Sequence, residues 1–193
     1  MAATAGGGLA LRIPKWVPGQ PAMEVTLSVV FGIDPGSKVT GYGVVQDTES
    51  GLRCLAFGRV LAPANSPHAV RLEKIYEGLS SAIEAWQPDV VAVETVFASK
   101  NVRMALEASH ARGVALLAAA NSGALVCEYS PMEIKRAVVG TGAASKKQVQ
   151  YMIEKLLCPQ EKPKADEADA LAVAVCHFNR VAGGIAQAQD HLQ

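Results

Sequence analysis

The sequence predicts an α/β fold in which helices cover both faces of one mixed β-sheet. Three β-rich runs come first, and the turn residues Pro35-Gly36 and Ser50-Gly51 separate them, which is typical of an antiparallel meander. Two further apolar runs then alternate with segments of helical periodicity, as in strands joined by helices. The chain of 193 residues fits one domain of ordinary size.

Five segments have the composition of strands and five that of helices. The predicted strands cover residues 27–33, 41–45, 52–61, 90–93 and 125–129. The predicted helices cover about residues 69–86, 101–120 and 131–138, a segment from 145 onward, and residues 166–180. The run Val90 to Val93 is apolar throughout, which favours a central strand covered on both faces. Pro131 suits a first helical turn, and Ser145 with Gln148 matches a capping box.

The two ends of the chain lack this periodicity. Residues 1–25 are rich in Ala, Gly and Pro, so we predict that they form a disordered extension. The folded domain is then predicted to cover residues 26–182. Residues 183–193 are predicted to form a C-terminal tail. No apolar run reaches the roughly 20 residues of a membrane-spanning helix. Four scattered cysteines fit reduced thiols, so we expect a cytoplasmic protein without membrane contact.

Acidic residues stand where strands end and a helix begins. Asp34 follows the first strand, and Glu94 ends the central one, where an isolated buried carboxylate would need a cation beside it. Asp166 and Asp169 are three residues apart and share one helix face, whereas Glu167 is expected to face solvent. As alternatives, Asp34 forms a turn and the others are ordinary strand-end and helix-start acids.

Together, these four acids predict a metal-dependent nuclease. Oxygen donors without His or Cys favour Mg²⁺, with Mn²⁺ as a substitute. Two such ions about 4 Å apart can activate a water and stabilise the leaving oxygen of a phosphodiester. The formal net charge of zero argues mildly against a strongly basic nucleic-acid binder, although the acids of a metal site offset basic residues in that total.

Several motifs resemble those of the RuvC-type Holliday-junction resolvases. They are FGIDPGSKVTGYGV at residues 31–44, AVETVF at 92–97, ARGVA at 111–115, VVGTG at 138–142 and the acidic segment at 164–172. The resemblance covers about residues 29–180 in the expected order and spacing. It departs from the family at the N-terminal extension and at Glu167, where the family often has a small residue.

The resemblance implies an RNase H-like fold with a mixed five-stranded sheet. It implies a homodimer that resolves four-way DNA junctions by symmetric paired nicks, in homologous recombination and DNA repair. Asp34, Glu94, Asp166 and Asp169 would be the catalytic acids and would bind two Mg²⁺ ions. The dimer would form through the helix at residues 101–120, whose small residues permit close approach. A branch-migration motor complex is an expected partner.

Basic residues between Glu94 and Asp166 are candidates for phosphate contacts. They are Lys100, Arg103, Arg112, Lys135, Lys146 and Lys147, and each taken alone also fits a solvated surface residue. Lys146 and Lys147 begin a helix, where backbone N–H groups favour phosphate as well. The resemblance favours Lys135 and Lys146. It also favours a ring of Phe97 that stacks on an unpaired base, against the alternative of a core phenylalanine.

Three other functions remain open from the sequence. An actin-like or sugar-kinase ATPase has a similar opening strand and glycine-rich turn, but such proteins usually have a second domain and an adenosine motif. An RNase H-like nuclease of structured RNA would carry the same acids, and we expect it to lack the features at Phe97 and Lys135–Lys147. A non-catalytic junction-binding protein would not need all four acids.

Overall fold

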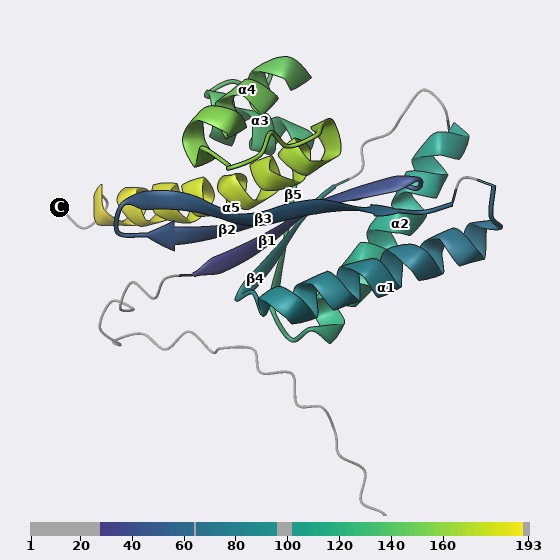
Figure 1. The fold of residues 1–193 in the computed structure, drawn as a ribbon. Coiled ribbons are helices and arrows are strands. Elements are labelled where there is room, and N and C mark those ends of the chain that lie inside the picture. The colour runs from purple at the N-terminus through teal and green to yellow at the C-terminus, as the bar shows by residue number, and fades with distance from the viewer. Residues whose placement is uncertain (1–27, 64, 96–101, 191–193) are drawn as a thin grey trace, which may run out of the picture.

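The structure is a computed structural model that describes residues 28–63, 65–95 and 102–190 (Figure 1). One five-stranded sheet lies at its centre, with the strand order β3-β2-β1-β4-β5. The strands are β1 (Val29–Asp34), β2 (Val39–Thr48), β3 (Gly51–Leu61), β4 (Val90–Glu94) and β5 (Leu125–Tyr129). β1, β2 and β3 pair antiparallel, whereas β4 pairs parallel to β1 and β5 parallel to β4. The predicted mixed sheet is confirmed.

Helices cover both faces of this sheet. The helices are α1 (His68–Trp86), α2 (Val102–Asn121), α3 (Pro131–Val139), α4 (Lys146–Leu157) and α5 (Ala165–Asp190). α1 and α2 pack on one face, and α3, α4 and α5 on the other (Figure 1). Ser145 caps α4 through the predicted capping box, and Pro131 begins α3. In the described residues no helix is long and apolar enough to cross a membrane.

The last helix is longer than the sequence pattern predicts. We expected it to end near Arg180, before Gly183 and Gly184, but α5 continues to Asp190. A glycine inside a helix costs about 1 kcal/mol relative to alanine, which weakens a helix without ending it. The boundaries of the domain and of its tails stay predictions.

Strand alternation decides which side chains meet which layer. Successive side chains of a strand point to opposite faces. On β1, Val30 lies in the core beneath α3, α4 and α5, whereas Phe31 and Ile33 lie in the core against α1 and α2. β4 alternates in the same way, with Ala92 towards α5 and Val93 towards α1. Asp34 and Glu94, the last residues of β1 and β4, therefore point to the layer that contains α5.

α5 lies directly on the backbone of β1 and β2. A Cβ atom on Gly32 would collide with the carbonyl oxygen of Ala170, and one on Gly41 with the carbonyl oxygen of Asp166. Only glycine lets a helix backbone approach a strand this closely. These two glycines set the height of α5 above the sheet at the turns that carry Asp166 and Asp169.

We predict that Gly32→Ala will lower the free energy of unfolding by at least about 2 kcal/mol, because overpacking against a helix backbone cannot be relieved by a side-chain rotation. Urea denaturation at a fixed protein concentration, with a chelator present, measures the effect. Gly142→Ala is the matched control, because a Cβ atom there meets first the flexible side chain of Met132, which can move aside. A Gly32→Ala protein as stable as the parent would contradict the close approach of α5.

Candidate active site

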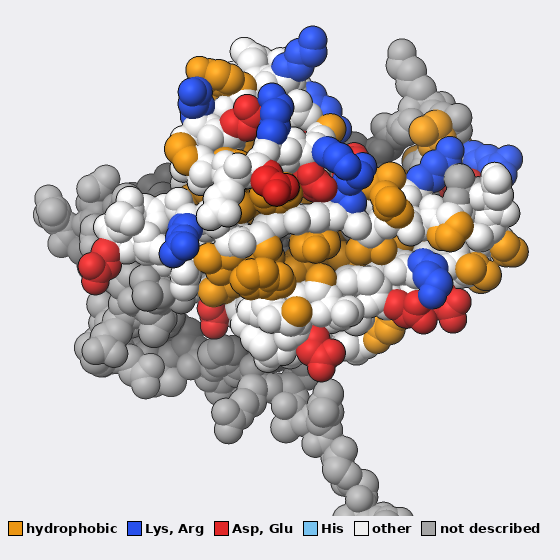
Figure 2. Space-filling view, in the orientation of Figure 1, with side chains coloured by type: hydrophobic (Ala, Val, Ile, Leu, Met, Phe, Trp, Pro, Cys, Tyr) orange, Lys and Arg blue, Asp and Glu red, His pale blue; other side chains and the backbone are white. Residues whose placement is uncertain are grey.

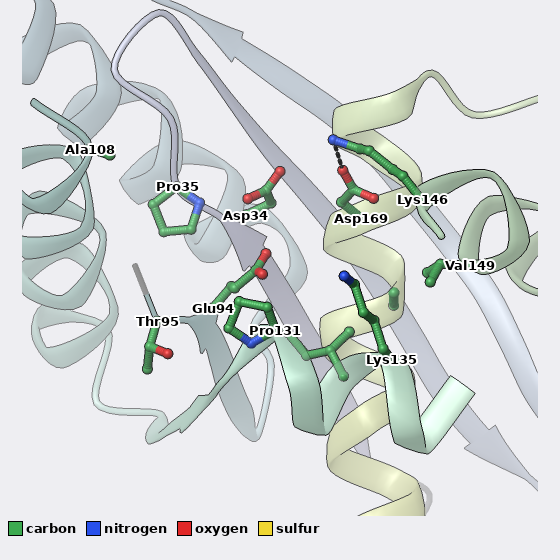
Figure 3. Close-up of a pocket in the computed structure, with 12 residues that line it drawn as sticks. Asp34, Pro35, Glu94, Thr95, Ala108, Pro131, Lys135, Lys146, Val149 and Asp169 are labelled. Carbon is green, nitrogen blue, oxygen red and sulfur yellow. Dashed lines mark ion pairs between the residues drawn. The ribbon is translucent and has the colours of Figure 1, made fainter. Parts of the chain in front are cut away.

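A cavity of about 370 Å³ opens where β1 and β4 end beside α5 (Figure 3). Three of the four predicted acids line it, together with two of the predicted basic residues. The lining consists of Asp34, Pro35, Glu94, Thr95, Ala108, Pro131, Ile134, Lys135, Lys146, Val149, Asp169 and Ala172. Segments far apart in the sequence therefore meet at one place, as the spacing of the motifs predicts.

The register of the sheet explains why two of these acids are neighbours. Ile33 of β1 pairs with Val93 of β4 in the parallel ladder, and Asp34 and Glu94 each follow by one residue. Both side chains point to the α5 face because of the strand alternation. Figure 3 shows their carboxyl groups facing the same space, across from Asp169 and Lys135.

The carboxyl groups of Asp34 and Glu94 lie close enough to influence each other's ionisation. Burial, followed by the charge of Asp169, raises the pKa of Asp34 to about 6. Burial, followed by the charge of Asp34, raises the pKa of Glu94 to about 8. A pKa of about 8 favours the protonated form of Glu94 near neutral pH. A cation bound beside the two carboxyls would relieve the same repulsion.

Asp169 has a different counter-charge. Its Oδ2 atom lies 2.5 Å from Nζ of Lys146, the first residue of α4 (Figure 3). Burial raises the pKa of the Asp169 carboxyl, and the Lys146 ammonium opposes that rise. The capping box at Ser145 fixes the first turn of α4 and so places Lys146 opposite α5.

Asp166 stands one helical turn before Asp169, at the edge of the cavity. It does not line the first cavity but an adjoining one of about 800 Å³, which also includes Gly36 and Lys38. Its negative charge contributes to the raised pKa values of Asp34 and Asp169. All four predicted acids are thus electrostatically coupled, although they do not converge on one point.

The prediction that Glu167 faces solvent is wrong. Its side chain is only 12% exposed, with Oε1 lying 3.4 Å from Nε of Arg59 on β3. Its other oxygen accepts the backbone N–H of Lys164 at 2.6 Å. Helical spacing correctly separated Glu167 from the two aspartates. It contained no sign that β3 would cover that second face.

The predicted DNA-binding residues lie at several different places. Lys135 and Lys146 line the first cavity, and Lys147 is exposed at the start of α4 beside them. Arg103 lines the second cavity and is 89% exposed. Arg112 forms an ion pair with Glu128 of β5 and lines neither of these cavities. Phe97 and Lys100 lie outside the described residues.

The residues of the first cavity are of the types that bind divalent cations, but their side chains are not arranged around one ion. Their donors are carboxylate oxygens, which Mg²⁺ and Mn²⁺ prefer, and their charges repel one another without a cation. Over the described part of the chain, no three His, Cys, Asp or Glu side chains gather closely enough to hold one ion. Asp169 turns instead to Lys146, so binding an ion there requires this contact to open.

Sequence reasoning missed the second cavity. Its lining includes Lys38, His68 and Arg71, which precede Glu94 and so lie outside the stretch where basic residues were sought. Lys38 belongs to the opening motif and stands four residues after Asp34, which is a usable signal. Arg71 sits in an ordinary amphipathic helix, where no pattern distinguishes it.

Comparison with known proteins places these features in one family. The family model for crossover junction endodeoxyribonuclease RuvC matches residues 30–177. A relative of that description from Desulforamulus reducens is 47% identical over 150 residues, which are 77% of this chain and 92% of the relative. Another from Dehalococcoides mccartyi is 50% identical over 151 residues, which are 78% and 92% of the two chains.

Solved structures agree with this assignment. RuvC of Thermus thermophilus in complex with a Holliday junction substrate aligns with a TM-score of 0.75 and 33% identity, over 81% of this chain and 96% of that one. The yeast mitochondrial Holliday junction resolvase Ydc2 aligns with a TM-score of 0.58 at 13% identity, over 78% of each chain, which concerns the fold alone. The predicted RNase H-like fold is confirmed. The chain belongs to the crossover junction endodeoxyribonuclease RuvC family.

Proposed function

We propose that this chain resolves four-way DNA junctions as a divalent-metal-dependent endonuclease that nicks two opposed strands. The observation that carries this proposal is the first cavity, where Asp34, Glu94 and Asp169 face Lys135 and Lys146. Carboxylates that burial makes costly to ionise, placed beside cations that suit a phosphate, form a site for metal-assisted phosphodiester hydrolysis. Relatives described as crossover junction endodeoxyribonucleases support the junction as the substrate.

Each acid has a defined part in this proposal. Asp34, Glu94, Asp166 and Asp169 would hold two Mg²⁺ ions, or Mn²⁺ in their place. When bound, such ions supply an activated water and a stabilised leaving oxygen. Binding of the ions would shift Asp34 and Glu94 to their ionised forms, with the released proton passing to solvent, and Asp169 would give up its contact with Lys146. The freed Lys146 ammonium then faces the cavity beside Lys135, where both can contact the scissile phosphate.

The proposed function includes a homodimer through α2. This helix buries Ala111, Ala115 and Ala118 towards its own domain. Its outer face carries Val102, Leu106 and Leu117, which are 70%, 55% and 53% exposed. Positions 102, 106, 113 and 117 follow helical spacing, so Gly113 lies on the same stripe and permits a close approach. A twofold axis there would give two sites for two opposed strands.

Two further parts of the proposal rest on the family resemblance alone. A branch-migration motor would deliver the junction, and the protein would act in the cytoplasm. The alternatives are less well supported. Lys135 and Lys146 line the cavity, which counts against a structured-RNA nuclease expected to lack them, and no relative cited above is described as an ATPase.

We predict that Asp169→Asn will slow cleavage of a synthetic four-way junction by at least about a hundredfold, because one donor of the metal site is lost. Junction binding should persist, because the lost charge repels phosphate. Gel assays of binding and cutting measure both, beside a linear duplex and an RNA hairpin. Asp47→Asn, at the opposite end of β2 from the site, is the control. Equal cutting by Asp169→Asn and the parent would reject the assigned site.

We predict that Glu94→Gln will stabilise the protein in chelator by roughly 1–3 kcal/mol at pH 8, because a buried ionised carboxyl is replaced by a neutral amide. The pKa values of Asp34 and Glu94 are raised to about 6 and about 8 in the folded chain. Their stabilising contribution is therefore complete below about pH 4 and declines as pH rises through these values. The variant should gain little near pH 4.

Thermal unfolding at both pH values measures this effect, where 1 kcal/mol corresponds to about 2–4 °C. Added Mg²⁺ should raise the melting temperature of the parent at pH 8 and have a smaller effect on Glu94→Gln. A variant less stable than the parent at pH 8 would show that Glu94 stabilises the fold rather than straining it.

We predict that Leu106→Glu will convert a dimer to monomers, because a charge buried between two helices costs several kcal/mol. This raises the Kd of the dimer by at least about a hundredfold. Sedimentation velocity over a range of concentrations measures it, and the monomer should nick one strand instead of two. Leu156→Glu, on the 45% exposed Leu156 of α4, is the matched control. A dimer that survives Leu106→Glu would move the interface elsewhere.

A further inference from the structure

The second cavity adjoins the first, beside Asp166. The turn between β1 and β2 divides them, with Pro35 lining the first and Gly36 the second, and Ala108 of α2 lines both. Asp166 lines the second cavity and is coupled by charge to the acids of the first. A strand of DNA that leaves the first cavity across the turn between β1 and β2 would therefore reach the second.

Cations dominate the lining of this second cavity. Lys38, Arg71 and Arg103 contribute positive charges, against the carboxylates of Glu107 and Asp166. Asp166 is one of the proposed metal ligands, so in the working enzyme its charge is offset by an ion. In Figure 2, Lys and Arg side chains are visible at this end of the molecule, where α1 and α2 begin. This lining therefore favours a second contact with a polyanion, beside the acids of the first cavity.

The three cations differ in how they are held. Nη1 of Arg71 donates to the carbonyl oxygen of Ser66 at 3.2 Å, and Nη2 lies 3.2 Å from Nδ1 of His68 and 3.4 Å from Glu107. Arg103 contacts the other oxygen of Glu107 at 3.4 Å. Arg71 is thus fixed and 13% exposed, while Arg103 is loosely held. Lys38 is exposed, and no carboxylate of the described residues pairs with its ammonium.

The start of α1 adds a second feature that suits an anion. Its N-cap residue is Pro67, which makes no side-chain capping bond, and its first turn has no acid. The first N–H groups of a helix lack acceptors within the helix and carry partial positive charge. His68 and Arg71 of this same first turn line the cavity. Uncapped N–H groups therefore lie beside the three cationic side chains.

We propose that the second cavity binds a backbone phosphate of the cleaved strand, one or a few nucleotides from the scissile phosphate, with Lys38 as its principal contact. Arg71 and the start of α1 supply a fixed positive field, and Arg103 closes over the strand from α2. This subsite rests on the proposed junction-cleaving function and adds a position to it. It holds the strand on the side of Asp166 that faces away from Lys135 and Lys146.

The first test is the salt dependence of junction binding by Lys38→Ala, in the Asp169→Asn background that does not cut. One lost phosphate contact lowers the slope of log K against log salt by about 0.9. The ratio of variant Kd to parent Kd should then fall by about threefold between about 50 and 200 mM salt. Lys38→Arg should restore the slope. Lys74→Ala, an exposed lysine of α1 paired with Glu77, is the matched control and should leave the slope unchanged.

A second test locates the phosphate. Junctions with a single neutral methylphosphonate at each position around the cut are bound to the Asp169→Asn parent and to its Lys38→Ala derivative. At one position near the cut, the replacement should weaken junction binding by the parent and cause no further loss of binding by Lys38→Ala. Equal slopes for Lys38→Ala and Lys74→Ala, or additive losses at every position, would overturn the subsite.

These outcomes also separate the subsite from the proposed function. If the parent prefers junctions over duplex and Lys38→Ala leaves the salt slope unchanged, the subsite is rejected and the proposed function stands. If the parent shows no preference for junctions but Lys38→Ala still lowers the salt slope, the phosphate subsite stands and the junction is rejected as the substrate. Lys38 is exposed and Lys38→Arg restores its charge, so loss of folding does not account for the expected pattern.

Discussion

The seating of α5 on the glycine backbone of β1 and β2 is the constraint on which the site depends. Gly32 and Gly41 leave no room for a Cβ atom beneath the helix, so the carbonyl oxygens of Ala170 and Asp166 rest directly on the strands. A larger residue would lift the helix, and the carboxyls of Asp166 and Asp169 would move away from Asp34 on the next strand end. The close packing of α5 on the strands therefore sets the distance between the like charges, because a contact between two backbones cannot relax.

That electrostatic arrangement is unfavourable without a counter-charge. The raised pKa values of Asp34 and Glu94 favour their neutral forms, which reduces their repulsion, and Asp169 pairs with Lys146. Bound divalent ions would replace the proton and the Lys146 ammonium as the positive charges that balance the carboxylates. A fold that keeps carboxyls in this state gives up stability for function, as strained active sites do. The core beneath them, with Val91 and Val93 fully buried, supplies the stability that is given up.

The sequence predicted most of this fold, because its signals are local and strong. Period-two runs, Pro131 and the capping box at Ser145 each specify one element, and the motif acids follow strand ends that a sheet must bring together. The features that the sequence did not predict are contacts between different elements. Glu167 is covered by β3 and bound to Arg59, and Arg112 is paired with Glu128, because those neighbours are set by how layers stack. Helical periodicity reports which residues share a face, but not what lies opposite it.

The position of Asp166 between two cavities connects these points. Asp169, one helical turn away, faces the first cavity, where the acids are crowded, while Asp166 borders the second, where cations are in excess. A phosphodiester backbone carries a negative charge at every nucleotide, so cations that flank the acids favour its approach. Lys135 and Lys146 flank one side, and Lys38, Arg71 and Arg103 the other. The zero net charge of the chain is therefore compatible with DNA cleavage, because the acids and the bases are sorted into neighbouring sites along one strand path.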